Sequence, residues 1–148
     1  SGGHTMLKAA AEAAADEAER LSVIRPKLLA VTVLTSIDAD EWQKLGHTNS
    51  ISQSVLTMAD TAKAAGMDGT VSSPHEAAEI RRLSGPDFLI VTPGIRPSFA
   101  QSNDQKRVTT PKEAIQNGAT HLVIGRPITK AADPQEAARA IMEEIREV

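Results

Sequence analysis

Two arginines and a glutamine in the second half of the chain lie beside short apolar runs, and all three are side chains that bind anions. Arg96 follows Gly94 in Thr-Pro-Gly-Ile-Arg, Arg126 follows Gly125 in Ile-Gly-Arg-Pro-Ile, and Gln105 lies in Asp-Gln-Lys-Arg. A glycine lets backbone N–H groups approach an anion closely, an arginine presents a planar fork of donors, and a glutamine amide adds a neutral donor. The combination predicts a phosphate-binding site.

The apolar runs beside these residues predict the strands that position them. Four runs, 27–34, 67–72, 88–92 and 121–124, are short and apolar enough to be strands buried on both faces. In parallel β/α proteins the loops at the carboxyl ends of the strands carry function, and in barrels the phosphate site is commonly built by the last two of them. We therefore expect the anion-binding residues to meet at one end of a parallel sheet.

Helix signals alternate with these strands. The run 5–20 is rich in Ala, Glu and Lys, and capping patterns at Asp38 and Ser50 predict two further helices. One helix opening then occurs three times, as a capping residue followed by Pro and, three positions after the cap, by Glu; the caps are Ser73, Thr110 and Asp133. Gly66 and Gly118 are expected to end helices. The alternation predicts an α/β fold of four successive β/α units with parallel strands.

Composition limits the classes of function. The 148 residues carry a net charge of −3 and include no cysteine, no tyrosine, one tryptophan and two phenylalanines. There is no cationic field or aromatic platform for nucleic acid, no apolar run of membrane-spanning length and no thiolate site for a metal. We expect a soluble cytoplasmic protein that binds neither nucleic acid nor membrane, and the four histidines show no metal-binding spacing.

Five segments in order resemble bacterial orotidine 5′-phosphate decarboxylases. They are Leu-Ala-Val-Thr-Val-Leu-Thr-Ser at 29–36, Asp-Gly at 68–69 with Ser-Pro-His-Glu at 73–76, Thr-Pro-Gly-Ile-Arg-Pro at 92–97, Asp-Gln-Lys-Arg at 104–107 and Gly-Arg-Pro-Ile-Thr at 125–129. Each segment alone is weak, but their shared order and spacing cover nearly the whole chain. The resemblance implies that residues 1–148 form a single partial domain, the C-terminal half of a (β/α)8 barrel.

The resemblance also implies an activity and a gap. The family converts orotidine 5′-monophosphate to uridine 5′-monophosphate in pyrimidine biosynthesis, usually as a homodimer and without metal or organic cofactor. Its chemistry rests on an Asp-x-Lys-x-x-Asp motif at the third barrel strand, and that motif does not occur in this chain. We therefore expect no catalytic residue here, an inactive isolated chain, and a partner that is either the front half of the enzyme or a second copy.

The residues of this chain that the resemblance does assign are substrate-binding residues. Thr35 matches a hydroxyl that contacts the pyrimidine ring, and Gln105 matches an amide that reaches both ring and phosphate. Gly125 and Arg126 match phosphate contacts, and Arg96 matches a residue of the phosphate loop, where it either binds phosphate or anchors a lid. All five are predicted substrate-binding residues.

Simpler interpretations remain open from the residues alone. Arg126 is equally typical of a surface position after an edge strand, Thr35 or Ser36 of a helix cap, and His75 of a solvated first helical turn. The alternative functions are another sugar-phosphate barrel enzyme, either a keto-sugar-phosphate decarboxylase or an epimerase, or a non-catalytic fragment that complements a partner.

Overall fold

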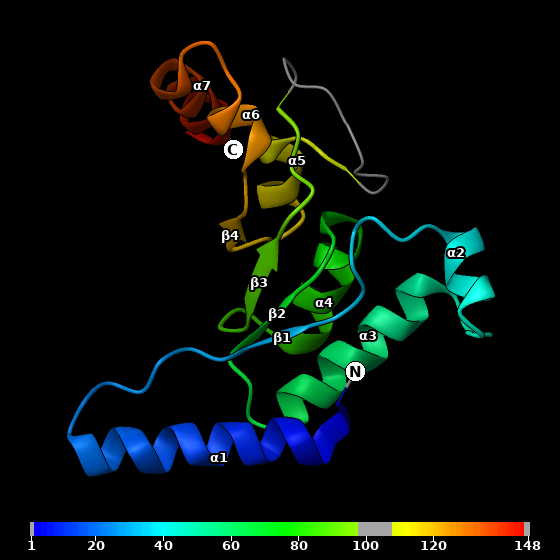
Figure 1. Cartoon of the computed structure of the whole chain (residues 1–148), viewed down its shortest axis with the longest axis vertical. Coiled ribbons are helices and arrows are strands. Elements are labelled where there is room, and N and C mark those ends of the chain that lie inside the picture. The colour runs from blue at the N-terminus through cyan, green and yellow to red at the C-terminus, as the bar shows by residue number, and fades with distance from the viewer. Residues whose placement is uncertain (1, 98–107, 147–148) are drawn as a thin grey trace.

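The computed structural model describes residues 2–97 and 108–146 as an α/β fold. Figure 1 shows a small sheet with α3 and α4 on one side of it, and places α1 and α7 at opposite ends of the molecule. Within the described residues the order is α1 (Gly3–Leu21), β1 (Leu29–Val31), α2 (Ala39–Lys44), α3 (Ile51–Ala64), β2 (Gly69–Val71), the 3-10 turn η1 (Pro74–Glu76), α4 (Ala77–Ser84), β3 (Leu89–Thr92), α5 (Pro111–Gln116), β4 (His121–Leu122), α6 (Arg126–Thr129) and α7 (Pro134–Arg146).

The four strands form one parallel sheet in the order β1-β2-β3-β4. This confirms the four predicted β/α units, although each strand is shorter than its apolar run. β1 and β2 each have three residues and pair over their whole length. Beyond Val31 the chain leaves the sheet and runs toward the functional end of the strands.

The register of the strands gives the sheet two different faces. Ala30, Thr70 and Ile90 lie side by side in the ladder and are buried, and Ile90 packs in the core with α3 and α4 residues such as Val55 and Ile80. Successive side chains of a strand point to opposite faces. The next row, Val31, Val71 and Val91, therefore forms what we call the inner face, where Val31 is 54% exposed and the other two are half-buried.

The helices begin at the predicted caps in most cases. Asp38 accepts from the backbone N–H of Glu41, and Ser50 with Gln53 forms a complete capping box. Thr110 and Glu113 form a second capping box, and Oδ1 of Asp133 accepts from two backbone N–H groups at the start of α7. Gly66 and Gly118 follow the helix ends with positive φ, as predicted.

The helix opening predicted at Ser73 is confirmed in its cap and its proline, but its first turn is a 3-10 turn and Glu76 does not complete a capping box. Ser73 Oγ accepts from the N–H of His75 at 3.3 Å, so a 3-10 turn precedes α4. The carboxylate of Glu76 does not fold back on the cap, because its Oε1 accepts a hydrogen bond from Ser52 Oγ at 2.9 Å. A tertiary contact with α3 thus replaces the local one that the spacing predicted.

Asp68 joins the amino ends of β1 and β2. Its carboxylate accepts from the backbone N–H of Leu28 at 2.8 Å, from Arg25 at 2.7 Å and from Lys27 at 3.1 Å. Burial raises the pKa of this carboxyl, but the three hydrogen bonds outweigh burial and hold the pKa below its ordinary value. The cluster fixes the connection from α1 into the sheet.

None of the helices in the described part of the chain has the length and apolar character needed to cross a membrane.

Candidate functional site

A cavity of about 380 Å³ lies at the carboxyl ends of the strands, and every strand contributes to it. The lining comes from the segment after β1, from the end of β2, from the turn after β3 and from the turn after β4; its residues are Val31, Val33, Leu34, Thr35, Ser36, Val71, Ser72, Pro93, Gly94, Arg96, Gly125 and Arg126. Four of the five predicted site residues, all except Gln105, therefore surround one cavity. Gln105 lies outside the described residues.

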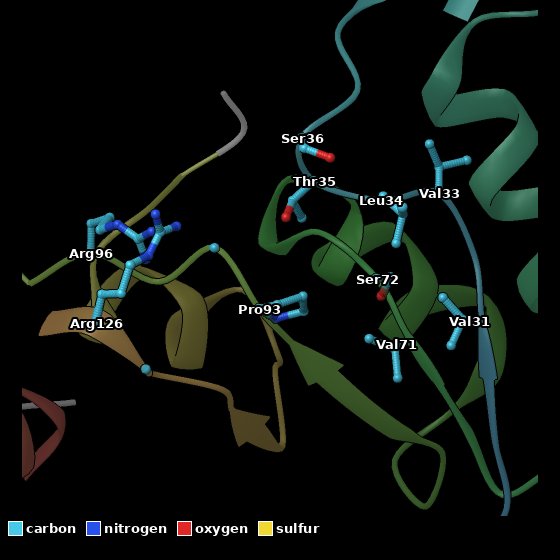
Figure 2. A pocket seen from close by; sticks show the side chains of 12 residues that line it. Val31, Val33, Leu34, Thr35, Ser36, Val71, Ser72, Pro93, Arg96 and Arg126 are labelled. Atoms are coloured by element: carbon cyan, nitrogen blue, oxygen red, sulfur yellow. The ribbon is translucent and has the colours of Figure 1, made fainter. Parts of the chain in front are cut away.

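One side of the cavity is cationic. Figure 2 shows the guanidinium groups of Arg96 and Arg126 next to each other, with Pro93 between them and the rest of the lining. None of the described lining residues is acidic, and arginine stays protonated at any physiological pH. This side of the cavity therefore has the charge and the donors to bind an anion such as phosphate.

The backbone around Arg96 is fixed on both sides. Gly94 has φ 79°, a left-handed conformation that turns the chain sharply after β3. The N–H of Arg96 donates to the carbonyl of Thr109 at 2.9 Å, and its Nη1 donates to the carbonyl of Ile95 at 2.8 Å. Arg96 is only 8% exposed, so its charged group is held at the cavity rather than extended into solvent.

Arg126 begins a short helix that the sequence did not predict. α6 starts at Arg126 with Gly125 as its N-cap, and the carbonyl of Gly125 accepts from the N–H groups of Ile128 and Thr129. Four residues are too few to show a helical period, so the only signal was Pro127 in the first turn, a position that proline favours. Among the described residues, no atom outside Gly125 and its two chain neighbours lies within 4 Å of where a side chain at Gly125 would begin, so this part of the fold leaves its backbone open to a ligand.

The opposite side of the cavity carries hydroxyl and apolar groups. Thr35 is 6% exposed whereas Ser36 is exposed, and both hydroxyls line the cavity. Figure 2 shows Thr35 and Ser36 on the far side of Pro93 from the two arginines, with Leu34 and Val71 nearby. A ligand that spans the cavity would meet charge at one end and a mixed apolar and hydroxyl surface at the other.

Several lining residues were not predicted as site residues. Val31 and Val71 belong to the inner face, and Pro93 follows β3 directly. Side chains alternate strictly between the two faces of a strand, and this alternation could have revealed the two valines. It does so only when one knows which of the alternate positions face the helices. Pro93 lies in the segment Thr-Pro-Gly-Ile-Arg-Pro at 92–97, but no role was predicted for it.

Comparison with known proteins agrees with this geometry. Residues 1–141 match the family described as orotidine 5′-phosphate decarboxylase / HUMPS. The chain belongs to this family. It is 51% identical over 144 residues to the orotidine 5′-phosphate decarboxylase of Trichlorobacter lovleyi and 49% identical over 146 residues to that of Moorella thermoacetica, covering 97% and 98% of this chain.

Solved structures of the family support the fold. The orotidine 5′-phosphate decarboxylase of Lactobacillus acidophilus superposes with a TM-score of 0.78 at 39% identity, covering 97% of this chain and 59% of that one. An uncharacterized conserved protein from Geobacillus kaustophilus gives a TM-score of 0.76 at 34% identity. The chain spans 59% and 58% of the lengths of the two curated relatives. The described sheet is thus part of the larger fold of its relatives.

Proposed function

We propose that this chain forms the phosphate- and pyrimidine-binding part of an orotidine 5′-phosphate decarboxylase, a lyase of pyrimidine biosynthesis. The observation that carries the proposal is one cavity, at the carboxyl ends of all four parallel strands, with two arginines on one side and a buried threonine on the other. The curated relatives named above carry this activity in their names. That agreement favours it over the keto-sugar-phosphate decarboxylase and epimerase alternatives.

Each predicted site residue then has a role. Arg126 and the backbone N–H of Gly125 bind the 5′-phosphate, and Arg96 adds a second guanidinium beside them. Gln105 bridges phosphate and ring, and the Thr35 hydroxyl hydrogen-bonds the pyrimidine. In the reaction the bond between the pyrimidine ring and its carboxylate breaks, CO2 leaves, and a proton takes its place on the ring carbon.

The phosphate contacts contribute to turnover although they lie away from the reacting carbon. Binding energy from a non-reacting group can drive closure and desolvation of the reacting centre, so its loss lowers kcat/KM and not only affinity. The Asp-x-Lys-x-x-Asp motif associated with proton transfer does not occur in this sequence. We therefore expect the isolated chain to bind nucleotide without decarboxylating it.

The exposed inner face calls for a covering partner. Val31 and Val123 are each more than half exposed, and the described sheet ends at β1 and β4 without further strands. A second, larger cavity of about 610 Å³ opens between α1, β1 and α3, with Met6, Leu7, Leu29 and Met58 among its lining. Uncovered apolar surface and open strand edges are unfavourable in water. We expect the remaining strands of a family barrel to cover these apolar surfaces and strand edges; the alternative is a second copy of this chain. We expect the complete enzyme to be a cytoplasmic homodimer.

Nucleotide binding tests the proposal directly. Uridine 5′-monophosphate and uridine are titrated into the chain and followed by NMR, with Arg126→Ala and the control Arg139→Ala, whose guanidinium pairs with Glu136 on the exposed side of α7. Arg126→Ala removes charge-assisted hydrogen bonds of about 1.5–3 kcal/mol, so the nucleotide should bind roughly 10- to 150-fold more weakly. Uridine binding and the control should be unchanged. Equal weakening of nucleotide and nucleoside would show that Arg126 is structural.

A further inference from the structure

His75 lies away from the cavity but contacts the segment that holds one of its arginines. Its Nε2 is 3.1 Å from the carbonyl oxygen of Val108, 33 residues later in the chain. A carbonyl can only accept, so Nε2 carries the hydrogen and donates it. From the sequence we expect the His75 side chain to be solvated. The imidazole is indeed exposed, but it also makes this tertiary contact.

The residue after Val108 holds Arg96. Thr109 pairs with Ile95 in an isolated parallel bridge, and the carbonyl of Thr109 accepts from the N–H of Arg96 at 2.9 Å. We call residues 108–110 the strap. The strap therefore contacts His75 at one residue and the backbone of Arg96 at the next.

The far end of the strap is fixed by the start of α5. Thr109 Oγ1 donates to the Glu113 carboxylate at 2.6 Å, and the N–H of Thr110 donates to it at 3.1 Å. The Thr109 hydroxyl and the Thr110 groups hold the pKa of Glu113 below its ordinary value, so the carboxylate stays charged and accepts these hydrogen bonds at neutral pH. The start of α5 therefore holds Thr109 and Thr110, and His75 holds the preceding residue, Val108.

His75 is itself well anchored. Its neighbours Pro74 and Glu76 are both buried, Ser73 caps its backbone N–H, and Glu76 is tied to Ser52 of α3. The imidazole is thus a donor on a rigid turn between β2 and α4. A donor on a rigid turn loses little conformational freedom when its hydrogen bond forms. It can therefore hold a residue of the next β/α unit at a fixed place.

We propose that His75 is a positioning residue for Arg96: through the strap it holds the backbone of Arg96 in the place from which the guanidinium lines the cavity. The inference rests on the proposed function only in naming phosphate as the ligand of that guanidinium. His75 does not line the cavity, so it acts through Arg96 and does not itself contact the ligand.

Amide hydrogen exchange measures the positioning without any ligand. In His75→Ala the N–H of Arg96 should exchange about 3- to 10-fold faster, because the strap that accepts its hydrogen bond is released. His75→Gln keeps an N–H donor at a similar reach and should restore most of the protection. The N–H of Ile90, in the middle of β3, should be unaffected in both variants. The matched control is His4→Ala, which removes an exposed imidazole from α1.

Nucleotide affinity measures the consequence for the site. His75→Ala should weaken binding of uridine 5′-monophosphate about 2- to 12-fold, the range for one neutral hydrogen bond, and leave uridine unchanged. Unchanged exchange at Arg96, equal losses for nucleotide and nucleoside, or no rescue by glutamine would each overturn the proposal. Absence of nucleotide binding by the unmodified chain would refute the proposed function, while the exchange rate of Arg96 would still decide the role of His75.

Discussion

Gly69 is the position where the packing of two strands tolerates no side chain. A Cβ built there lies 2.2 Å from the carbonyl oxygen of Leu89 and 2.5 Å from its Cβ, in the neighbouring strand. Ordinary contacts of these kinds are about 3.3 Å and 3.5–4.0 Å, so Gly69→Ala must move β2 and β3 apart by about 1 Å. The hydrogen bond from the N–H of Leu89 to the carbonyl of Asp68, now 2.9 Å, would then exceed bonding distance.

The cost follows from these contacts. Overpacking costs about 1–3 kcal/mol and the lost hydrogen bond about 0.5–1.5 kcal/mol. Alanine also restricts the unfolded chain, which offsets about 0.4–1 kcal/mol. Gly69→Ala should therefore lower the free energy of unfolding by about 2 kcal/mol, the centre of the roughly 0.5–4 kcal/mol that these terms span, measured by urea denaturation as a shift in midpoint at unchanged slope.

A second glycine provides the matched control. Gly46 has φ 89°, and among the described residues no atom beyond its chain neighbours lies within 4 Å of an added Cβ, so Gly46→Ala costs only the left-handed backbone, about 1 kcal/mol. Gly69 has no positive φ, so its cost comes from contact alone. A loss at Gly69 no larger than that at Gly46 would refute the argument that β2 and β3 approach too closely for a side chain.

Two further changes test the buried side of the sheet, which packs on the helices, and the amino ends of β1 and β2. Thr70 Oγ1 is buried without a hydrogen-bond partner among the described residues, so Thr70→Val should raise the free energy of unfolding by about 1 kcal/mol, read from urea denaturation; destabilisation would reveal a partner such as a buried water. Asp68 has a folded pKa below its ordinary value of 3.8, so it contributes stability above about pH 4 that is lost as pH falls through the folded pKa. Asp68→Asn should cost about 1.5–3 kcal/mol at pH 7 and reduce the loss of stability on acidification, whereas an unchanged pH profile would assign that loss to other groups.

The alternation of strands with helices and most helix starts could be predicted because their causes are local. Ser50, Thr110 and Asp133 cap their helices through groups two or three residues away, and such spacing is visible in a sequence. Ser73 has the same spacing, but Glu76 bonds Ser52 instead. A sequence does not show which of two available partners a carboxylate will take when the second is 24 residues away.

The candidate site was predictable in its residue types and not in its contacts. Glycine and arginine at strand ends indicated Arg96 and Arg126, and the structure places both at one cavity. The inner-face valines and the contact of His75 with Val108 depend on register and on long-range packing. The alternation along a strand identifies the valines only once the face that packs on the helices is known, and the His75 contact leaves no signal within one segment.

Under the proposed function, binding and turnover should be separable, because different parts of the fold would supply them. The groups proposed to bind the phosphate hold their positions through contacts within the described part: Arg96 through Thr109, and Arg126 through the turn at Gly125. The inner face, by contrast, borders the side of the cavity opposite the two arginines, and its Val31 is exposed there. The described lining of the cavity contains no acidic residue and no lysine. Under that proposal, phosphate affinity should depend mainly on this chain, while the groups that protonate the ring would approach from the open side of the sheet. A partner that covers the inner face should accordingly change kcat far more than it changes the affinity for phosphate.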